Sequence, residues 1–301
     1  MPGLRAVLFN AYMRLRMKSK PIHLIDPGLL RANTDKIAPR RTPATIALES
    51  LSAGPVKGEW HRPRGGTDGR TVFYMHGGGY VFGSAKSHRG LTFKLAEEAR
   101  ADVFSLDYRL APEHPYPAAV EDALAAYRML LDEGRDPARL VVGGDSAGGG
   151  LCLALMLSCK AQGLALPAGA FLYSPWTDLA ATGASLDRNE ASDVMFKKAY
   201  LAGGARRYLN GADPTDPLAS PLYGDHAGLP RTLVFVSDSE ILHDDSARLH
   251  EKLLASGVSS AMIVERGLAH VWPIFYPRFP EAGRSIKQTA DFIASCVGGE
   301  A

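Results

Sequence analysis

The chain has 301 residues, of which 46% are hydrophobic and 22% are charged, a balance typical of a globular protein rather than a disordered one. Its 34 Lys and Arg residues nearly match its 32 Asp and Glu residues, so the net charge of +2 lacks the basic excess of a dedicated nucleic-acid-binding protein. The three cysteines are too few for a disulfide scaffold, and Cys152 and Cys159 fall about 10 Å apart in one expected helix. We therefore expect a cytoplasmic protein without disulfides.

The first forty residues predict a basic amphipathic helix followed by a segment punctuated by prolines. Arginines and lysines interrupt this segment too often for a signal peptide, and no run of about eighteen apolar residues occurs that could span a membrane. Basic amphipathic helices can lie on anionic lipid. We favour the alternative, that the helix docks its apolar stripe on the body of the protein. The stripe recurs at helical spacing and consists of Leu4, Val7, Leu8, Tyr12 and Leu15.

From about Thr45 onward, short apolar runs alternate with helical patterns. The first two expected strands, 44–51 and 56–62, are separated by a turn and predict an antiparallel pair. Such alternation predicts an α/β fold, with a mostly parallel sheet and helices on both of its faces. The further expected strands are 71–75, 102–106, 140–142, 170–173, 232–237 and 261–265, and the expected helices are 87–100, 118–132, 147–161, 243–255 and 282–296.

Two stretches interrupt this alternation and predict a cap. They are residues 1–40 and residues 177–228, and the second contains one helical run at 194–210. We expect them to cover one end of a core formed by residues 41–176 and 229–301. In open α/β sheets the ligand site lies beyond the carboxyl ends of the strands, so the cap is expected to cover that site.

A G-x-S-x-G motif, Gly144-Asp145-Ser146-Ala147-Gly148, lies between an expected strand and an expected helix. This is the setting of a nucleophile elbow, in which small residues let the chain turn sharply and present the serine at a helix N-terminus. A phosphate-binding turn is the alternative, but neither G-x-G-x-x-G nor a following lysine is present. The motif predicts Ser146 as a nucleophile.

Three glycines follow the strand at 71–75 in the sequence His76-Gly77-Gly78-Gly79. Glycines let backbone N–H groups approach a ligand closely, because no side chain intervenes. Together with a nucleophile elbow, such a loop supplies the donors of an oxyanion hole. We expect these donors to be the N–H groups of Gly77, Gly78 and Ala147.

A nucleophilic serine needs a base, and the candidates downstream of it are His226, His243, His250 and His270. Only His270 follows the last expected strand across a loop, where the chain order serine, acid, histidine would place the base. The acid is expected after the strand at 232–237. Asp244 and Asp245 belong to the first turn of the next helix, where acids stabilise the N-terminus. The residues alone do not separate Asp238 from Glu240.

These motifs, in this order, resemble the hormone-sensitive-lipase-like branch of the α/β-hydrolases, the bacterial family IV carboxylesterases. The resemblance covers roughly three-quarters of the chain, from about Arg70 to the C-terminus. It implies an α/β-hydrolase fold, an acyl-enzyme route to hydrolysis of short- to medium-chain esters, and no cofactor. No cluster of His and Cys residues has metal-ligand spacing, so we expect no metal site. The family commonly has aspartate where this chain has Glu240, a change that resembles a glutamate-bearing subgroup, so the resemblance favours Glu240 over Asp238 as the acid. The matching segments are 76–80, 107–119, 143–149, 216–221 and 267–270.

The resemblance also suggests roles for residues around these motifs. Tyr108, Arg109 and Glu113 resemble a structural turn that supports the oxyanion loop. We expect a small-molecule ester substrate, no nucleic-acid partner and no stable membrane insertion, and a homodimer is left open. Amide hydrolysis by an N-deacetylase, or ligand binding without catalysis, are the alternatives, and an intact Ser146 and His270 argue against the second. Side chains expected either in the substrate pocket or in the core are Tyr80, Phe82, Trp176 and Trp272.

Overall fold

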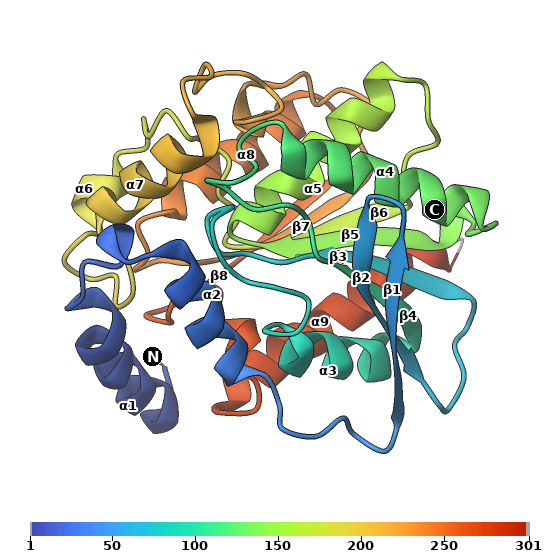
Figure 1. The fold of residues 1–301 in the computed structure, drawn as a ribbon, viewed down its shortest axis with the longest axis horizontal. Helices are drawn as coiled ribbons and strands as arrows, with labels where there is room; N and C mark the ends of the chain where they lie inside the picture. Colours follow the sequence, from blue (N-terminus) through green and yellow to red (C-terminus); the bar gives the residue numbers. More distant parts are fainter. Residues whose placement is uncertain (1, 299–301) are drawn as a thin grey trace.

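The computed structural model describes residues 2–298, which contain an eight-stranded sheet of order β1-β2-β4-β3-β5-β6-β7-β8 (Figure 1). β1 (Ile46–Ala53) pairs with β2 (Val56–Pro63) in antiparallel fashion, and β2 pairs in the same way with β4 (Ala101–Leu106). The remaining neighbours are parallel. The expected fold class is therefore confirmed. The other strands are β3 (Arg70–Met75), β5 (Leu140–Asp145), β6 (Gly169–Tyr173), β7 (Thr232–Ser237) and β8 (Ser260–Glu265).

Helices cover both faces of the sheet, as parallel strands require. On β3, Phe73 and Met75 join the core beneath one helical layer, while Val72 and Tyr74 join the core beneath the other. Successive strand residues point to opposite faces, so the continuous apolar runs of these strands fill both cores. α4 (Ala118–Asp132), α5 (Ala147–Ala161) and α8 (His243–Ala255) form one layer, and α3 (Arg89–Ala99) and α9 (Pro280–Val297) form the other (Figure 1).

The N-terminal segment lies beside the segment that follows β6 (Figure 1). The Tyr200 hydroxyl donates to the carbonyl of Lys18 at 2.8 Å, and the Arg14 guanidinium donates to the carbonyl of Ala191 at 3.0 Å. The two stretches expected to form a cap are thus in contact. Their helices are α1 (Leu4–Met13), a π-helical turn (Arg14–Lys18), α2 (Pro27–Thr34), α6 (Ser185–Arg188) and α7 (Lys198–Leu209). Short 3₁₀ turns cover Ile22–Leu24, Asp35–Ile37, Pro137–Arg139, Pro221–Tyr223 and Trp272–Phe275.

α7 begins four residues later than the helical run expected at 194–210. The Asp193 carboxylate accepts the N–H groups of Met195 and Phe196 at 2.7 and 2.9 Å. Side-chain acceptors of this kind compete with helical hydrogen bonding and hold the backbone in a turn. The apolar residues at 194–196 therefore belong to a loop.

The expected docking of the α1 stripe on the body of the protein is wrong. α1 packs through its other side, where Ala6 and Met13 are buried and Phe9 lies 4.6 Å from Phe275 between ring centroids. The expected stripe faces outward: the exposed fractions are 76% for Leu4, 47% for Val7, 63% for Leu8, 52% for Tyr12 and 73% for Leu15. Within residues 2–298, no helix combines the length and apolar character needed to cross a membrane.

Candidate active site

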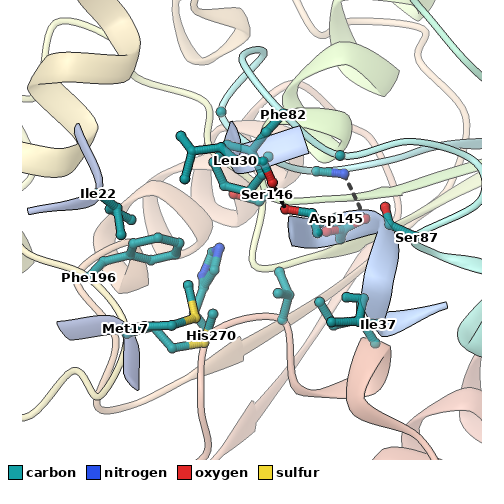
Figure 2. Close-up of a pocket in the computed structure, with 18 of the residues that line it drawn as sticks. Met17, Ile22, Leu30, Ile37, Phe82, Ser87, Asp145, Ser146, Phe196 and His270 are labelled. Carbon is teal, nitrogen blue, oxygen red and sulfur yellow. Dashed lines mark hydrogen bonds between the residues drawn. The ribbon is translucent and has the colours of Figure 1, made fainter. Parts of the chain in front are cut away.

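Ser146 lies at the sharp turn between β5 and α5 (Figure 2). Its backbone has φ 51° and ψ −119°, a conformation that L-residues rarely adopt. The turn is crowded, because a Cβ atom at Gly144 would lie 2.5 Å from the carbonyl oxygen of Gly148 and 2.6 Å from that of Met75. Glycine at position 144 is therefore required for β5 and α5 to meet this closely, and the strained turn presents Ser146 ahead of the first turn of α5.

His270 follows β8 and is brought to the same cavity as Ser146 (Figure 2). It is 2% exposed, and its Nδ1 lies 3.1 Å from Oε1 of Glu240. Its Nε2 is buried and has no hydrogen-bond partner among the described residues. A buried polar atom without a partner is uncommon, and in a cavity it is available to a ligand or to a nearby hydroxyl. The structure thus leaves one ring nitrogen of His270 free beside the serine.

Glu240, in the turn after β7, is 1% exposed and holds His270 through one carboxylate oxygen. Its other oxygen accepts the Ser174 hydroxyl at 2.8 Å and the N–H of Ser237 at 3.1 Å. Asp238 is exposed and instead accepts the N–H of Gly267 at 2.8 Å. Of the two carboxylates that the residues alone did not separate, the structure brings Glu240 to His270.

The surroundings of His270 favour its protonated form. Burial disfavours the imidazolium, but the charge and hydrogen bond of Glu240, with a further contribution from Asp193, outweigh burial and raise the pKa of His270 above 6.5. The Phe196 ring meets the imidazole edge-on at 5.0 Å between centroids. His270 is therefore held in one orientation and is suited to carry a proton during a reaction.

The donors expected for the oxyanion hole need one correction. The N–H of Gly77 donates to Oδ1 of Asp145 at 2.9 Å, so Gly77 cannot also donate to an oxyanion. Among the described residues, the N–H groups of Gly78, Gly79 and Ala147 have no acceptor. Gly79 thus takes the place of Gly77 in the candidate hole, because the Asp145 contact holds the loop with its next two N–H groups unoccupied.

Buried polar contacts hold the oxyanion loop from below. Asp145 also accepts the Tyr74 hydroxyl at 2.6 Å and lies 3.3 Å from Nε2 of His88. The Tyr108 hydroxyl donates to the carbonyl of His76 at 2.7 Å, and the two rings stack at 4.3 Å, which agrees with the supporting role expected for Tyr108. Burial, together with the charge of His88, lowers the pKa of His76 to about 3, so His76 is neutral here.

Arg109 and Glu113, the other two residues of the expected structural turn, contact α4 and α2. Arg109 donates to the Asp122 carboxylate on α4 at 2.9 Å. Glu113 pairs with Arg31 of α2 at 2.6 Å, so this turn connects the oxyanion loop region to the N-terminal segment. Neither residue lines the cavity beside Ser146.

A cavity of about 770 Å³ contains Ser146 and His270. Phe82 and Trp176, two of the four side chains expected either in the substrate pocket or in the core, line this cavity, and Trp176 is also buried in the core. Tyr80 and Trp272 belong to the core instead: Tyr80 stacks on Tyr208 at 3.8 Å, and Trp272 is fully buried. Apolar side chains that the two cap stretches contribute to the lining include Met17, Ile22, Leu30, Ile37 and Phe196 (Figure 2).

Sequence reasoning did not identify Ser174, Asp193 and His88 as members of the site. Ser174 donates to Glu240 and accepts the N–H of Val271 at 3.2 Å, and its position directly after β6 was the available signal. Asp193 and His88 lie in a loop and at the start of a helix, where polar residues are ordinary. Within residues 2–298, no three His, Cys, Asp or Glu side chains cluster as metal ligands would.

Comparisons with known proteins agree with this architecture. Residues 72–274 match a family described as having the alpha/beta hydrolase fold. An acetyl-hydrolase of Streptomyces hygroscopicus is 44% identical over 248 residues, covering 82% of this chain and 83% of that protein. An esterase of Acinetobacter venetianus is 36% identical over 272 residues, with 89% of each chain covered.

Solved structures give the same assignment. A crystal structure of an esterase from the bacterial hormone-sensitive lipase family superimposes with a TM-score of 0.94 at 38% identity, covering 99% of this chain and 100% of that one. A crystal structure of an esterase/lipase from an uncultured bacterium gives the same values. This chain therefore belongs to the α/β-hydrolase family and, within it, to the bacterial hormone-sensitive-lipase-like serine esterases.

Proposed function

We propose that this protein hydrolyses carboxylic esters through an acyl-enzyme, with Ser146 as the nucleophile, His270 as the base and Glu240 as the orienting acid. One observation carries the proposal: a buried His270–Glu240 pair leaves Nε2 of the histidine without a hydrogen-bond partner among residues 2–298, in the cavity that Ser146 also lines. A nucleophile, a base and a third group that orients the base are the three parts of such a site.

The reaction follows from these positions. The Ser146 hydroxyl attacks the ester carbonyl and gives its proton to Nε2 of His270, and Glu240 stabilises the imidazolium. The N–H groups of Gly78, Gly79 and Ala147 hold the oxyanion, a contribution of about 3–4 kcal/mol for each well-placed donor. His270 then protonates the leaving alcohol. Water then attacks the carbonyl of the acyl-enzyme and gives its proton to Nε2 of His270. His270 returns this proton to Ser146 as the carboxylic acid leaves.

We also propose that residues 1–40 and 177–228 act as a cap over the catalytic end of the sheet and set acyl-chain preference. Support comes from the lining, because Met17 and Ile22 of the first stretch and Phe196 of the second meet around one cavity. An apolar enclosure of this kind favours compact acyl groups, which it can desolvate completely. Esters from acetate to hexanoate are the preferred substrates on this account.

Hydrolysis rates over a p-nitrophenyl ester series from acetate to palmitate test the proposal. Acetate to hexanoate should exceed palmitate, and Ser146→Ala should lose at least about 10⁴-fold in kcat, because its nucleophile is gone. Ser87→Ala is the matched control, since Ser87 also lines the cavity but lies outside the proposed triad and oxyanion hole, and it should stay within about tenfold of wild type. Hydrolysis that survives in Ser146→Ala contradicts the proposal. Faster cleavage of p-nitroacetanilide than of p-nitrophenyl acetate would make the protein an amidase.

A further inference from the structure

Exposed apolar side chains of this protein are concentrated in its N-terminal segment. Single exposed hydrophobic residues are ordinary, but a group of them on one surface indicates an interaction site. Outside this segment, the only large hydrophobic residues that are exposed among those described are Leu254 and Val264. Within it they are Leu4, Val7, Leu8, Tyr12, Leu15, Leu24, Leu29 and Ile37.

The outward face of α1 has an apolar centre with cations beside it. At about 100° of rotation per residue in α1, Leu4 and Leu8 fall at the centre of this face and Arg5 falls along one side. Leu15 and Arg16, both exposed, follow in the π-helical turn that continues α1. We call these five residues the α1 face. Among the described residues, no carboxylate lies within salt-bridge distance of Arg5 or Arg16. Both guanidinium groups are therefore free to meet an anionic partner.

The charge of the chain is distributed unevenly. Residues 1–41 contain nine Lys and Arg residues and two Asp residues, a net charge of +7. The whole chain has +2, so the remaining residues carry −5. A segment that is both basic and apolar complements a surface that is both anionic and apolar, which is the description of a bilayer containing acidic lipids.

The α1 face also adjoins the catalytic cavity. Tyr12 and Arg16 are exposed, and both belong to the cavity lining together with Lys20. α1 lies at the margin of the molecule (Figure 1). A partner that covers the α1 face would therefore meet the protein beside the route to Ser146.

We propose that the α1 face docks on an anionic lipid surface, with α1 lying in the plane of the interface. The leucines enter the boundary between headgroups and acyl chains, and Arg5 and Arg16 bind lipid phosphates. A second copy of this chain fits less well, because a two-fold interface would bring the same +7 segments together and they would repel one another. The inference does not depend on catalysis, so it stands or falls separately from the proposed esterase activity.

Cosedimentation of the full chain with vesicles tests the inference. Wild type should sediment with vesicles of equal parts phosphatidylglycerol and phosphatidylcholine, and at least about tenfold less with phosphatidylcholine alone. The double variant Leu8→Glu/Leu15→Glu should lose at least about tenfold in binding to the anionic vesicles, because it places two carboxylates in the apolar centre. The control Leu254→Glu, an exposed leucine of α8, should bind as wild type does.

Three outcomes would overturn the inference. Wild type that stays in the supernatant with anionic vesicles has no lipid-docking face, and equal binding to both vesicle types removes the role of the arginines. A dimer that Leu8→Glu/Leu15→Glu converts to a monomer, measured by light scattering without vesicle binding, would assign the face to a second copy. Hydrolysis of p-nitrophenyl acetate by the double variant should equal that of wild type, which shows that loss of binding is not loss of folding.

Discussion

The carboxylate that contacts Nδ1 of His270 belongs to a glutamate, whose side chain is one methylene longer than that of aspartate. Three donors surround it: Nδ1 of His270 on one oxygen, and the Ser174 hydroxyl and Ser237 N–H on the other. The extra methylene of Glu240 is accommodated because the turn after β7 places its side chain back toward the strand end. Asp238 points to the outer loop and accepts the N–H of Gly267.

Substitution of each carboxylate by its amide separates the two roles. Glu240→Gln should lower kcat by about 10⁴-fold, because the orientation and tautomer of His270 are no longer fixed and its imidazolium is no longer stabilised. Asp238→Asn should stay within about tenfold of wild type, since an amide oxygen can still accept the Gly267 N–H. Steady-state kinetics on p-nitrophenyl butyrate, with melting temperatures as a check on folding, measure both. The opposite ranking would move the acid to Asp238.

The pH dependence of catalysis follows from the raised pKa of His270. The neutral imidazole is the base, so kcat/KM rises as pH rises through the folded-state pKa, and the midpoint of that rise should lie above 6.5. In Glu240→Gln the charge that raises the pKa is absent while burial remains, so the midpoint of the residual activity should move to lower pH. Profiles from about pH 5 to pH 9 check this. An unmoved midpoint in the variant would show that Glu240 does not act on His270.

At the scale of elements, the buried carboxyl group of Asp245 on α8 binds the backbone of the loop that follows β6. Asp245 accepts the N–H groups of Thr177 and Asp178 at 2.8 and 2.9 Å. Burial raises the pKa of Asp245 to about 7. In the unfolded chain an aspartate titrates near 3.9, so the folded state binds this proton more tightly. The resulting stabilisation is complete below pH 3.9 and is lost as pH rises through 7.

Asp245→Asn removes this dependence, because the amide resembles the protonated acid. The free energy of unfolding of the variant, relative to wild type, should therefore increase by about 2–3 kcal/mol between pH 5 and pH 8. Urea denaturation at the two pH values measures the difference. Asp291→Asn, an exposed aspartate of α9, serves as the control and should show no such trend. A variant that is less stable than wild type at pH 8 would mean that the ionised carboxylate is the native form.

Most elements of the fold could be predicted from the sequence, because strand runs and helical periodicity are local properties. The antiparallel pair β1–β2 and helices α4, α5 and α8 have the expected positions within two residues. The start of α7 could not be predicted, since Asp193 competes for backbone N–H groups. The direction of the α1 stripe also could not, because helical spacing shows that a stripe exists without showing whether the body of the protein covers it.

Within the site, too, local motifs could be predicted from the sequence, whereas contacts between distant segments could not. Ser146 and His270 follow from motifs and chain order, and the structure brings both to one cavity. The residues alone left Glu240 and Asp238 open, and only the resemblance favoured Glu240. This choice, and the choice between Gly77 and Gly79, depend on contacts between the ends of neighbouring strands. Asp145 is close in sequence to the serine, yet it acts on a loop 68 residues away. Contacts between residues so far apart cannot be inferred from the spacing of motifs alone.

At the scale of the whole molecule, the strand order explains why distant residues meet. β3, β5, β6, β7 and β8 are consecutive neighbours and parallel, so their carboxyl ends lie along one edge. The oxyanion loop follows β3, Ser146 follows β5, Glu240 follows β7 and His270 follows β8. Crossover connections place these loops together, and side chains from both stretches proposed as the cap line the cavity beside them.

Covalent labelling with a fluorophosphonate tests the central claim most directly, because it reports the nucleophile without assuming a substrate. The probe should add one mass increment to the intact protein, and peptide mapping should place it on Ser146. Ser146→Ala should remain unlabelled under the same conditions, and Glu240→Gln should label far more slowly than wild type because His270 is no longer oriented. An adduct that persists in Ser146→Ala, or that maps to another residue in wild type, would contradict the assignment of Ser146 as the nucleophile.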